Sequence, residues 1–285
     1  MTVDSTVTAI NNASAPLALA HKMEMILMKR FINVLGLVVV LMVLVACGSS
    51  EQGDADEVLS VLTMGTSADF YPFQFIDLET EEIVGFDVDV ARHIATELGY
   101  ELLVEDMNFD SLIPALRTGR FDMVLASMNA TEQRRELVDF SDVYHQSSPA
   151  MVLTTRDVSL ESVEDLTGLI IGVQTGSTQS DIAEGLIYDG IAFETLIMDR
   201  IPDLVQQLIT GRVDAIILDD APAAGHVRNN ENLVLADIIE DAEPGIAIAL
   251  PQGSELTAQI NEILADMLEN GKMDELVEQW LTGDE

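Results

Sequence analysis

The chain has 285 residues, of which 48% are hydrophobic and 5% aromatic, so it holds enough apolar material for one large domain or two smaller ones. Its single cysteine excludes a disulfide framework and any cysteine-based zinc cluster. With 13 basic and 50 acidic residues the formal net charge is −37, which excludes nucleic acid and basic membrane-surface binding. Such acidity is typical of a self-repelling surface, or of a salty or acidic exterior.

An apolar run of 16 residues, Phe31 to Ala46, follows two basic residues near the start of the chain. It is shorter than the roughly 20 residues of a membrane-spanning helix, so it is typical of the core of a signal peptide. The only cysteine, Cys47, comes directly after this run. An uncleaved anchor or a buried thiol is the alternative interpretation of this position.

The letters LVAC followed by GSS resemble the lipobox of bacterial lipoproteins. The resemblance implies that Cys47 is lipidated and becomes the mature N-terminus, and two or more acyl chains give stable anchoring. We therefore expect residues 1–46 to be an N-terminal extension and lipoprotein signal peptide, with Met28 as the favoured start. Residues 47–57 are small, acidic and without apolar periodicity, which predicts a flexible tether.

The remaining chain alternates between strand and helix patterns. Strands are expected at 58–65, 73–76, 83–86, 102–104, 123–126, 150–154, 169–173, 191–198, 215–218 and 246–250. Helices are expected at 87–98, 111–118 with Pro114 in the first turn, 131–137 capped by Thr131, 178–186, 201–210, 222–228, 256–268 and 273–281. This alternation predicts an α/β fold with largely parallel sheets, and about 230 residues of it suit two lobes. Ligands in such folds bind beyond the carboxyl ends of strands.

No catalytic signature appears among these elements. The four histidines do not share metal-ligand spacing, and the chain lacks the G-x-S-x-G, P-loop and H-E-x-x-H motifs. We therefore expect no metal, no cofactor and no enzymatic activity.

Four segments carry a resemblance to a known family: GTSADFYPFQF at 65–75, IVGFDVDVA at 83–91, FDSLIPALRTGRFDMVLASMNATEQRRELVDFSDVY at 109–144 and GRVDAIILDDAPA at 211–223. Together and in this order they resemble the polar amino-acid-binding proteins of ABC importers, the family 3 extracellular solute-binding proteins. The resemblance covers roughly residues 58–283. It implies a two-lobed α/β clamshell of the periplasmic-binding-protein-like type II, with two hinge crossovers.

The resemblance also implies a domain division and a function. Lobe 1 would hold residues 58–145 and 251–285, and lobe 2 would hold 146–250 with the hinge strands. The function implied is a monomeric extracellular lipoprotein that captures a polar amino acid in the cleft between the lobes. It would deliver this ligand to the permease of an ABC importer, from a lipid anchor on the outer face of the cell membrane.

A free amino acid carries a carboxylate and an ammonium group, and a site that excludes water must match both. Arg134 has a planar guanidinium suited to a bidentate carboxylate contact, and it matches the carboxylate-binding arginine of the family. Alternatively, Arg134 and Arg135 pair with nearby glutamates on the surface. Asp219 matches the ammonium-binding aspartate, and its neighbour Asp220 stays open because only one of the two points into the cleft.

Further ligand contacts implied by the resemblance are hydroxyls, amides and aromatic walls. They are Ser67, Phe70, Phe109, Ser127, Asn129, Gln174 and Thr178. The Thr178 hydroxyl and N–H would meet the ligand carboxylate, and the two phenylalanines would sandwich the ligand. Asn129 stands where the family often has threonine or serine.

Ligand choice depends on two uncharged positions. Ser67 stands where cation-selective relatives often place an acid, and Gln174 stands where another relative has a lysine. Both favour a polar neutral amino acid over a cationic one. Asp69 would restore a cationic preference if its side chain faces the cleft.

Two other function classes use the same fold. One is an enzyme resembling cyclohexadienyl dehydratase, which requires a positioned acid or base, and no histidine matches the cleft. The other is the ligand-sensing domain of a receptor, which the sequence disfavours because no second membrane span or kinase segment follows Gly283.

Overall fold

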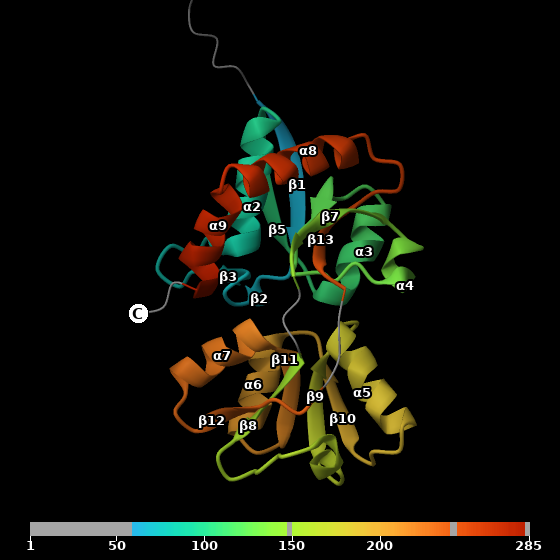
Figure 1. Ribbon diagram of the computed structural model, residues 1–285, viewed down its shortest axis with the longest axis vertical. Coiled ribbons are helices and arrows are strands. Elements are labelled where there is room, and N and C mark those ends of the chain that lie inside the picture. Colours follow the sequence, from blue (N-terminus) through green and yellow to red (C-terminus); the bar gives the residue numbers. More distant parts are fainter. Residues whose placement is uncertain (1–58, 147–149, 240–243, 283–285) are drawn as a thin grey trace, which may run out of the picture. The chain divides into compact units, whose positions relative to one another are not determined.

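The computed structural model describes residues 59–146, 150–239 and 244–282 (Figure 1). The predicted signal peptide, the lipidation of Cys47 and the tether lie outside the described residues. No helix within the described ranges is long and apolar enough to cross a membrane. The predicted α/β class is confirmed, and its strands form two five-stranded sheets.

The first sheet has the strand order β5-β1-β6-β13-β7. Its members are β1 (Ser60–Thr66), β5 (Tyr100–Asp106), β6 (Met123–Val124), β7 (Asp139–His145) and β13 (Ile246–Leu250). β1 runs parallel to β5 and β6, whereas β13 runs antiparallel to β6 and β7. A separate small sheet contains β2 (Asp69–Phe70), β3 (Gln74–Ile76) and β4 (Ile83–Val84). β3 and β4 overlap the strands predicted at 73–76 and 83–86, and they pair antiparallel.

Helices cover both faces of the first sheet. They are α2 (Phe86–Glu97), α3 (Phe109–Arg117), α4 (Glu132–Arg135), α8 (Leu256–Glu269) and α9 (Lys272–Val277), the last followed by a π-turn, η2 (Glu278–Thr282). All five residues of β13 are buried, and alternate side chains serve opposite faces. Ile248 and Leu250 join the apolar cluster that contains α2, whereas Ala247 and Ala249 join the cluster that contains α3.

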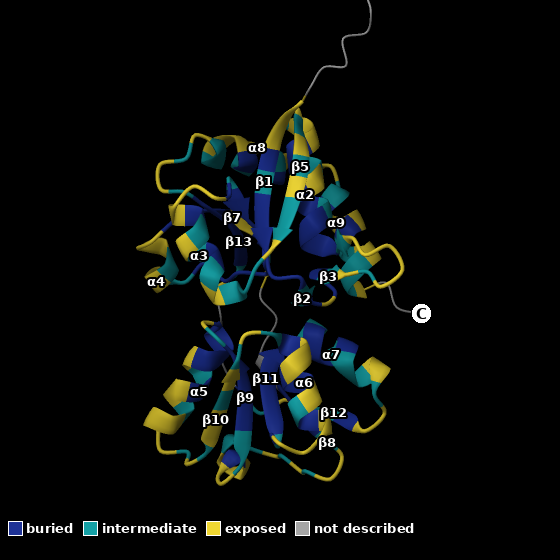
Figure 2. Cartoon of the chain, turned by 180° about the vertical axis from the view of Figure 1, so that it is seen from behind, coloured by how far each residue is buried: buried dark blue, intermediate teal, exposed yellow. Residues whose placement is uncertain are grey.

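The second sheet has the order β10-β9-β11-β8-β12. Its members are β8 (Ala150–Thr155), β9 (Ile170–Gln174), β10 (Glu194–Met198), β11 (Ala215–Asp219) and β12 (Leu233–Ala236). The accompanying helices are α5 (Thr178–Tyr188), α6 (Ile201–Ile209), α7 (Asp220–Asn229) and the 3₁₀ turn η1 (Val163–Leu166). Ile216 of β11 joins the apolar cluster of α6, and Ile217 joins that of α5, so both faces are covered. Figure 2 shows buried strands beneath helices with exposed outer faces.

The chain passes from the first sheet to the second after β7 and returns to the first as β13. The sequence assigned 246–250 to the second lobe with its hinge strands, but β13 is hydrogen-bonded within the first sheet. It enters antiparallel, as β8 does beside β11, so both sheets are mixed rather than largely parallel. A strand that arrives from the other sheet needs no βαβ crossover and can therefore take either direction. The predicted lobe boundaries stay a prediction.

Two local expectations were also wrong. Helix α3 begins at Phe109, two residues earlier than predicted, so Pro114 lies inside the helix and not in its first turn. No strand was predicted at 139–145, whose letters are DFSDVYH. These residues form β7, whose pairing with β13 contains register shifts that break the period of two.

Candidate ligand-binding site

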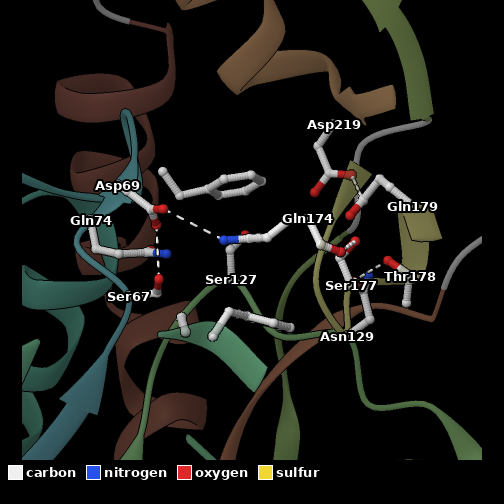
Figure 3. A pocket seen from close by; sticks show the side chains of 13 residues that line it. Ser67, Asp69, Gln74, Ser127, Asn129, Gln174, Ser177, Thr178, Gln179 and Asp219 are labelled. Atoms are coloured by element: carbon white, nitrogen blue, oxygen red, sulfur yellow. Dashed lines mark hydrogen bonds between the residues drawn. The ribbon is translucent and has the colours of Figure 1, made fainter. Parts of the chain in front are cut away.

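A cavity lies between elements of the two sheets and encloses about 330 Å³ of space, its opening included (Figure 3). Its lining is polar, with two aromatic rings. The thirteen residues are Ser67, Asp69, Phe70, Gln74, Phe109, Ala126, Ser127, Asn129, Gln174, Ser177, Thr178, Gln179 and Asp219. The structure thus brings every predicted ligand-binding residue except Arg134 to the wall of one cavity. Their ligand contacts stay a prediction.

Arg134 lies beside this cavity, behind one of its aromatic walls. Its guanidinium carbon is 5.2 Å from the centre of the Phe109 ring. Its Nη1 donates to the carbonyl of Asn129 at 2.9 Å, and its Nη2 donates to the carbonyl of Gly176 at 3.1 Å. The predicted cap is confirmed, since Thr131 Oγ1 accepts from the Arg134 N–H. Arg134 therefore touches two residues of the lining and joins the two parts of the chain that form the cavity.

Gly176 permits this close approach. Its φ of +71° lies in the left-handed region, and a Cβ placed on it would be 3.2 Å from the Cβ of Asp110. A side chain here would push the turn before α5 away from the start of α3. Glycine at this position therefore allows a tight turn between β9 and α5.

Arg135 points elsewhere. Its Nε donates to the carbonyl of Ala130 at 3.0 Å, and its guanidinium carbon is 5.3 Å from the Phe140 ring centre. Phe140 belongs to the core of the first sheet and not to the cavity. The two neighbouring arginines thus have separate environments, and Arg134 is the one near the cavity.

The Asp219 end of the cavity is built by β11 and the start of α5. Asp219 is the last residue of its strand and is buried, and its Oδ1 accepts from Gln179 Nε2 at 2.5 Å. Asp219 occupies the N-cap position of α7 but makes no side-chain cap bond. Asp219 is among the residues that line the cavity and Asp220 is not. Which of the two binds a ligand ammonium stays a prediction. Thr178 Oγ1 donates to Asn129 Oδ1 at 3.4 Å across the cavity.

The opposite end is built around Asp69. Ser67 Oγ donates to Asp69 Oδ1 at 2.8 Å, and the Ile201 N–H at the start of α6 donates to Oδ2 at 3.0 Å. Burial raises the pKa of Asp69, while the hydrogen bonds from Ile201 and Ser67 and the charge of Arg200 oppose this rise. A carboxylate has about four acceptor positions, so Asp69 keeps capacity for a ligand donor.

Four lining residues were not predicted from the sequence: Gln74, Ala126, Ser177 and Gln179. Gln74 Oε1 and Ser127 Oγ are buried and find no hydrogen-bond partner within the described part of the chain. Buried polar atoms are almost always paired, so two orphans on one cavity wall indicate a polar ligand. The alternation of the strand predicted at 73–76 was the available signal for Gln74, because the next residue, Phe75, points to the other face.

Beside the cavity, a polar cluster joins the two parts of the chain. Arg200 donates to both oxygens of Asp106, at 2.9 and 2.8 Å, and its Nε donates to Asn108 Oδ1 at 3.0 Å. Asn108 Nδ2 in turn donates to Asp199 Oδ2 at 3.2 Å. We name Asp106, Asn108, Asp199 and Arg200 the clasp. None of its members is among the residues that line the cavity.

We expect the substitution Arg200→Gln to weaken ligand affinity about two- to fivefold, because a partly exposed bidentate ion pair contributes up to about 1 kcal/mol to the closed form. Titration calorimetry in low and high salt measures it, and the loss should shrink in high salt. The matched control is Arg120→Gln, which removes an ion pair with Glu105 inside the first lobe. Equal effects of both variants would show that the clasp has no role in closure.

The cavity has a polar lining, which strand ends and helix starts of the two lobes provide, and each lobe is built around one sheet. This arrangement is typical of a solute-binding protein. The chain belongs to the bacterial extracellular solute-binding proteins, family 3, whose family model matches residues 62–283. This confirms the resemblance stated from the sequence.

Individual relatives cover most of the chain. The arginine-binding extracellular protein ArtP of Bacillus subtilis is 40% identical over 260 residues, which cover 90% of this chain and 100% of ArtP. A probable histidine-binding protein of Campylobacter jejuni is 31% identical over 87% of this chain and 95% of its own. Among solved structures, AbpA of Streptococcus pneumoniae bound to L-arginine has a TM-score of 0.72 and 30% identity, covering 77% of this chain and 94% of AbpA.

Proposed function

We propose that the protein captures a free amino acid with a cationic side chain, arginine foremost, and delivers it to an ABC importer. The observation that carries the proposal is the pair of carboxylates, Asp69 and Asp219, on opposite sides of one cavity (Figure 3). No lysine or arginine is among the residues described as lining it.

The charges of an amino acid fit this arrangement only if its side chain is positive. The ligand ammonium pairs with Asp219 and the ligand carboxylate pairs with Arg134 after a small movement of that side chain. Asp69 then remains. The nearby Arg200 is already engaged by both oxygens of Asp106, so a buried Asp69 carboxylate is unfavourable without a further cation. A cationic side chain completes the charge balance. A guanidinium also offers several donors in one plane, which match Asp69 and the orphan Oε1 of Gln74.

The sequence favoured a neutral ligand because Ser67 and Gln174 are uncharged, and it left Asp69 open. Asp69 lines the cavity, which meets the condition for a cationic preference. Relatives support the same choice, since ArtP is named an arginine-binding protein and AbpA was solved with L-arginine. The enzyme alternative has less support, because the named relatives are binding proteins, including a solved ancestral amino-acid-binding precursor of cyclohexadienyl dehydratase.

Titration calorimetry with arginine, lysine, histidine and glutamine tests the proposal. We expect arginine to bind wild type more tightly than glutamine. The substitution Asp69→Asn should weaken arginine binding at least about tenfold, because it removes the charge that faces the ligand cation. It should leave glutamine binding within about threefold. Tighter binding of glutamine than of arginine to wild type would refute the cationic ligand.

We also propose the lipid anchor that the sequence predicts. Cys47 would carry two or more acyl chains, and residues 1–46 would be removed, which places the protein on the outer face of the membrane. The intact mass of protein extracted from membranes should match a chain that begins at a diacylated Cys47. The substitution Cys47→Ala should release the protein from the membrane fraction or leave it unprocessed. A mature protein with a free thiol at position 47 would contradict the anchor.

A further inference from the structure

We propose that Asp87 is a positioning residue, which holds the Ser127 backbone in place and so shapes the polar wall of the ligand cavity. This inference rests on the proposed function, because Ser127 is assigned to the ligand site. Asp87 itself does not line the cavity. Its connection to the ligand is therefore indirect.

Both oxygens of Asp87 are used inside the protein. Oδ2 accepts the Ser127 N–H at 2.6 Å, and Oδ1 accepts the Tyr144 hydroxyl at 2.7 Å. Asp87 is fully buried, and the ion pairs found in the described residues do not include it. Burial raises its pKa to about 7 against the effect of these two hydrogen bonds. A buried carboxylate without a basic partner is unfavourable, so it needs a reason other than stability.

Ser127 supplies that reason. Its φ is +51°, in the left-handed region that residues other than glycine rarely adopt. Such strain persists only where the surroundings impose it, and it gathers at functional sites. The hydrogen bond from the Ser127 N–H to Asp87 fixes this conformation. The Ser127 side chain lies on the cavity wall with its buried Oγ unpartnered within the described residues, ready for a ligand.

The start of helix α2 holds the Asp87 carboxylate beside the Ser127 N–H. The helix starts after Gly85, whose φ is +131° and where a Cβ would lie 2.4 Å from the carbonyl oxygen of Phe73. The Asp87 N–H donates to the same carbonyl at 2.9 Å. These contacts fix the first turn of α2. Asp87 therefore cannot move away from Ser127 without disrupting the start of the helix.

The other partner of Asp87 connects the cavity to the strand from which the chain leaves the first sheet. Tyr144 lies on β7, and its ring stacks on Phe86 with centres 6.0 Å apart. A second link joins the cavity to the returning chain, since Asn129 Nδ2 donates to the carbonyl of Pro244 at 2.8 Å. Ser127 is thus connected through Asp87 to β7, from which the chain leaves the first sheet. Asn129 is bonded to Pro244, close to where the chain returns as β13.

The alternative is that Asp87 only favours the start of α2, as an acid near a helix N-terminus does. Asp89 is a matched control for that role, because it lies in the same first turn and contacts Arg92 and Trp280 instead of the cavity. If Asp87 acts only on the helix, Asp87→Ala and Asp89→Ala should affect ligand binding alike.

A double-mutant cycle on the full mature chain, titrated with L-arginine, tests the inference. Asp87→Ala should weaken arginine binding at least tenfold, whereas Asp87→Asn, which keeps an acceptor for Ser127, should retain affinity within about threefold. Ser127→Gly removes the need for a fixed φ, since glycine adopts +51° readily. In that background Asp87→Ala should therefore change affinity less than threefold. An equal loss in both backgrounds, or a loss equal to that of Asp89→Ala, would overturn the inference.

Hydrogen–deuterium exchange of the Ser127 amide gives a readout that needs no ligand. Exchange should speed up at least tenfold in Asp87→Ala and stay near wild type in Asp87→Asn and Asp89→Ala. If wild type binds no amino acid but this pattern appears, the proposed function fails while Asp87 still positions Ser127. Unchanged exchange in Asp87→Ala would overturn the positioning role. Should Asp87→Ala not fold, Asp87→Glu, which displaces the acceptor, replaces it in both measurements with the same expectations.

Discussion

Replacement of Arg134 by alanine should abolish amino-acid binding while the protein stays folded. The side chain is partly exposed and forms no part of an apolar cluster, so its loss leaves the two cores intact. The ligand carboxylate, however, would lose its cationic partner in a cavity with two carboxylates. Loss of one member of a desolvated charge pair costs roughly 2–5 kcal/mol, which is a weakening of about 30-fold to several-thousand-fold. Titration calorimetry and a thermal melt measure binding and folding separately.

Arg135→Ala is the matched control for this prediction. It removes the same charge one residue away, from a side chain that packs on Phe140 and bonds to Ala130. We expect its affinity to stay within about threefold of wild type. The reverse result, with Arg135→Ala inactive and Arg134→Ala normal, would show that the ligand carboxylate meets a different arginine.

The pH dependence of stability should reveal the buried Asp87 carboxyl. Its pKa is about 7 in the folded protein and 3.8 in its ordinary state. Between these values the folded state holds a proton that the unfolded state lacks, so stability falls as pH rises through this window and levels off above it. From pH 5 to pH 8 the contribution lost is on the order of 3 kcal/mol. Urea unfolding of wild type and Asp87→Asn over this range measures it.

The comparison with Asp87→Asn separates the titration of the buried Asp87 from that of the many acidic residues on the surface. Burial raises the pKa of Tyr144, its contact partner, so that hydroxyl stays neutral across the window. Burial lowers the pKa of His145, which adds stability as pH rises, but this effect is common to both proteins. Parallel pH profiles for wild type and Asp87→Asn would show that Asp87 is not the titrating group.

Apolar periodicity was sufficient to predict most of the fold, because each buried strand and each amphipathic helix is decided by nearby residues. It failed where pairing between distant segments decides the structure. β7 lacks alternation and exists because β13 pairs with it over its length. The same dependence on a distant partner hid the antiparallel entry of β13 into the first sheet.

The candidate site likewise contains residues that nearby sequence identifies and residues that only distant contacts place. Asp219 and Thr178 were predictable because they end a strand or start a helix next to recognisable motifs. Gln74 lies within a quoted segment and Gln179 near another strand end, but neither was assigned to the site, and both are placed on the cavity wall by the packing of their elements. The direction of Asp69 was also open in the sequence, since its strand β2 has only two residues. It is settled by the bond from Ile201, which lies 132 residues away.

The position of β13 also sets the order in which the chain can fold as it is made. This strand lies in the interior of the first sheet, between β6 and β7, yet it is formed by residues 246–250. The second sheet is built from one continuous stretch and can assemble as soon as β12 is synthesised. The first lobe must wait for almost the whole chain, and such non-local pairing is slow. The first sheet is therefore completed only after residues 246–250 have been made, more than 100 residues after its other strands.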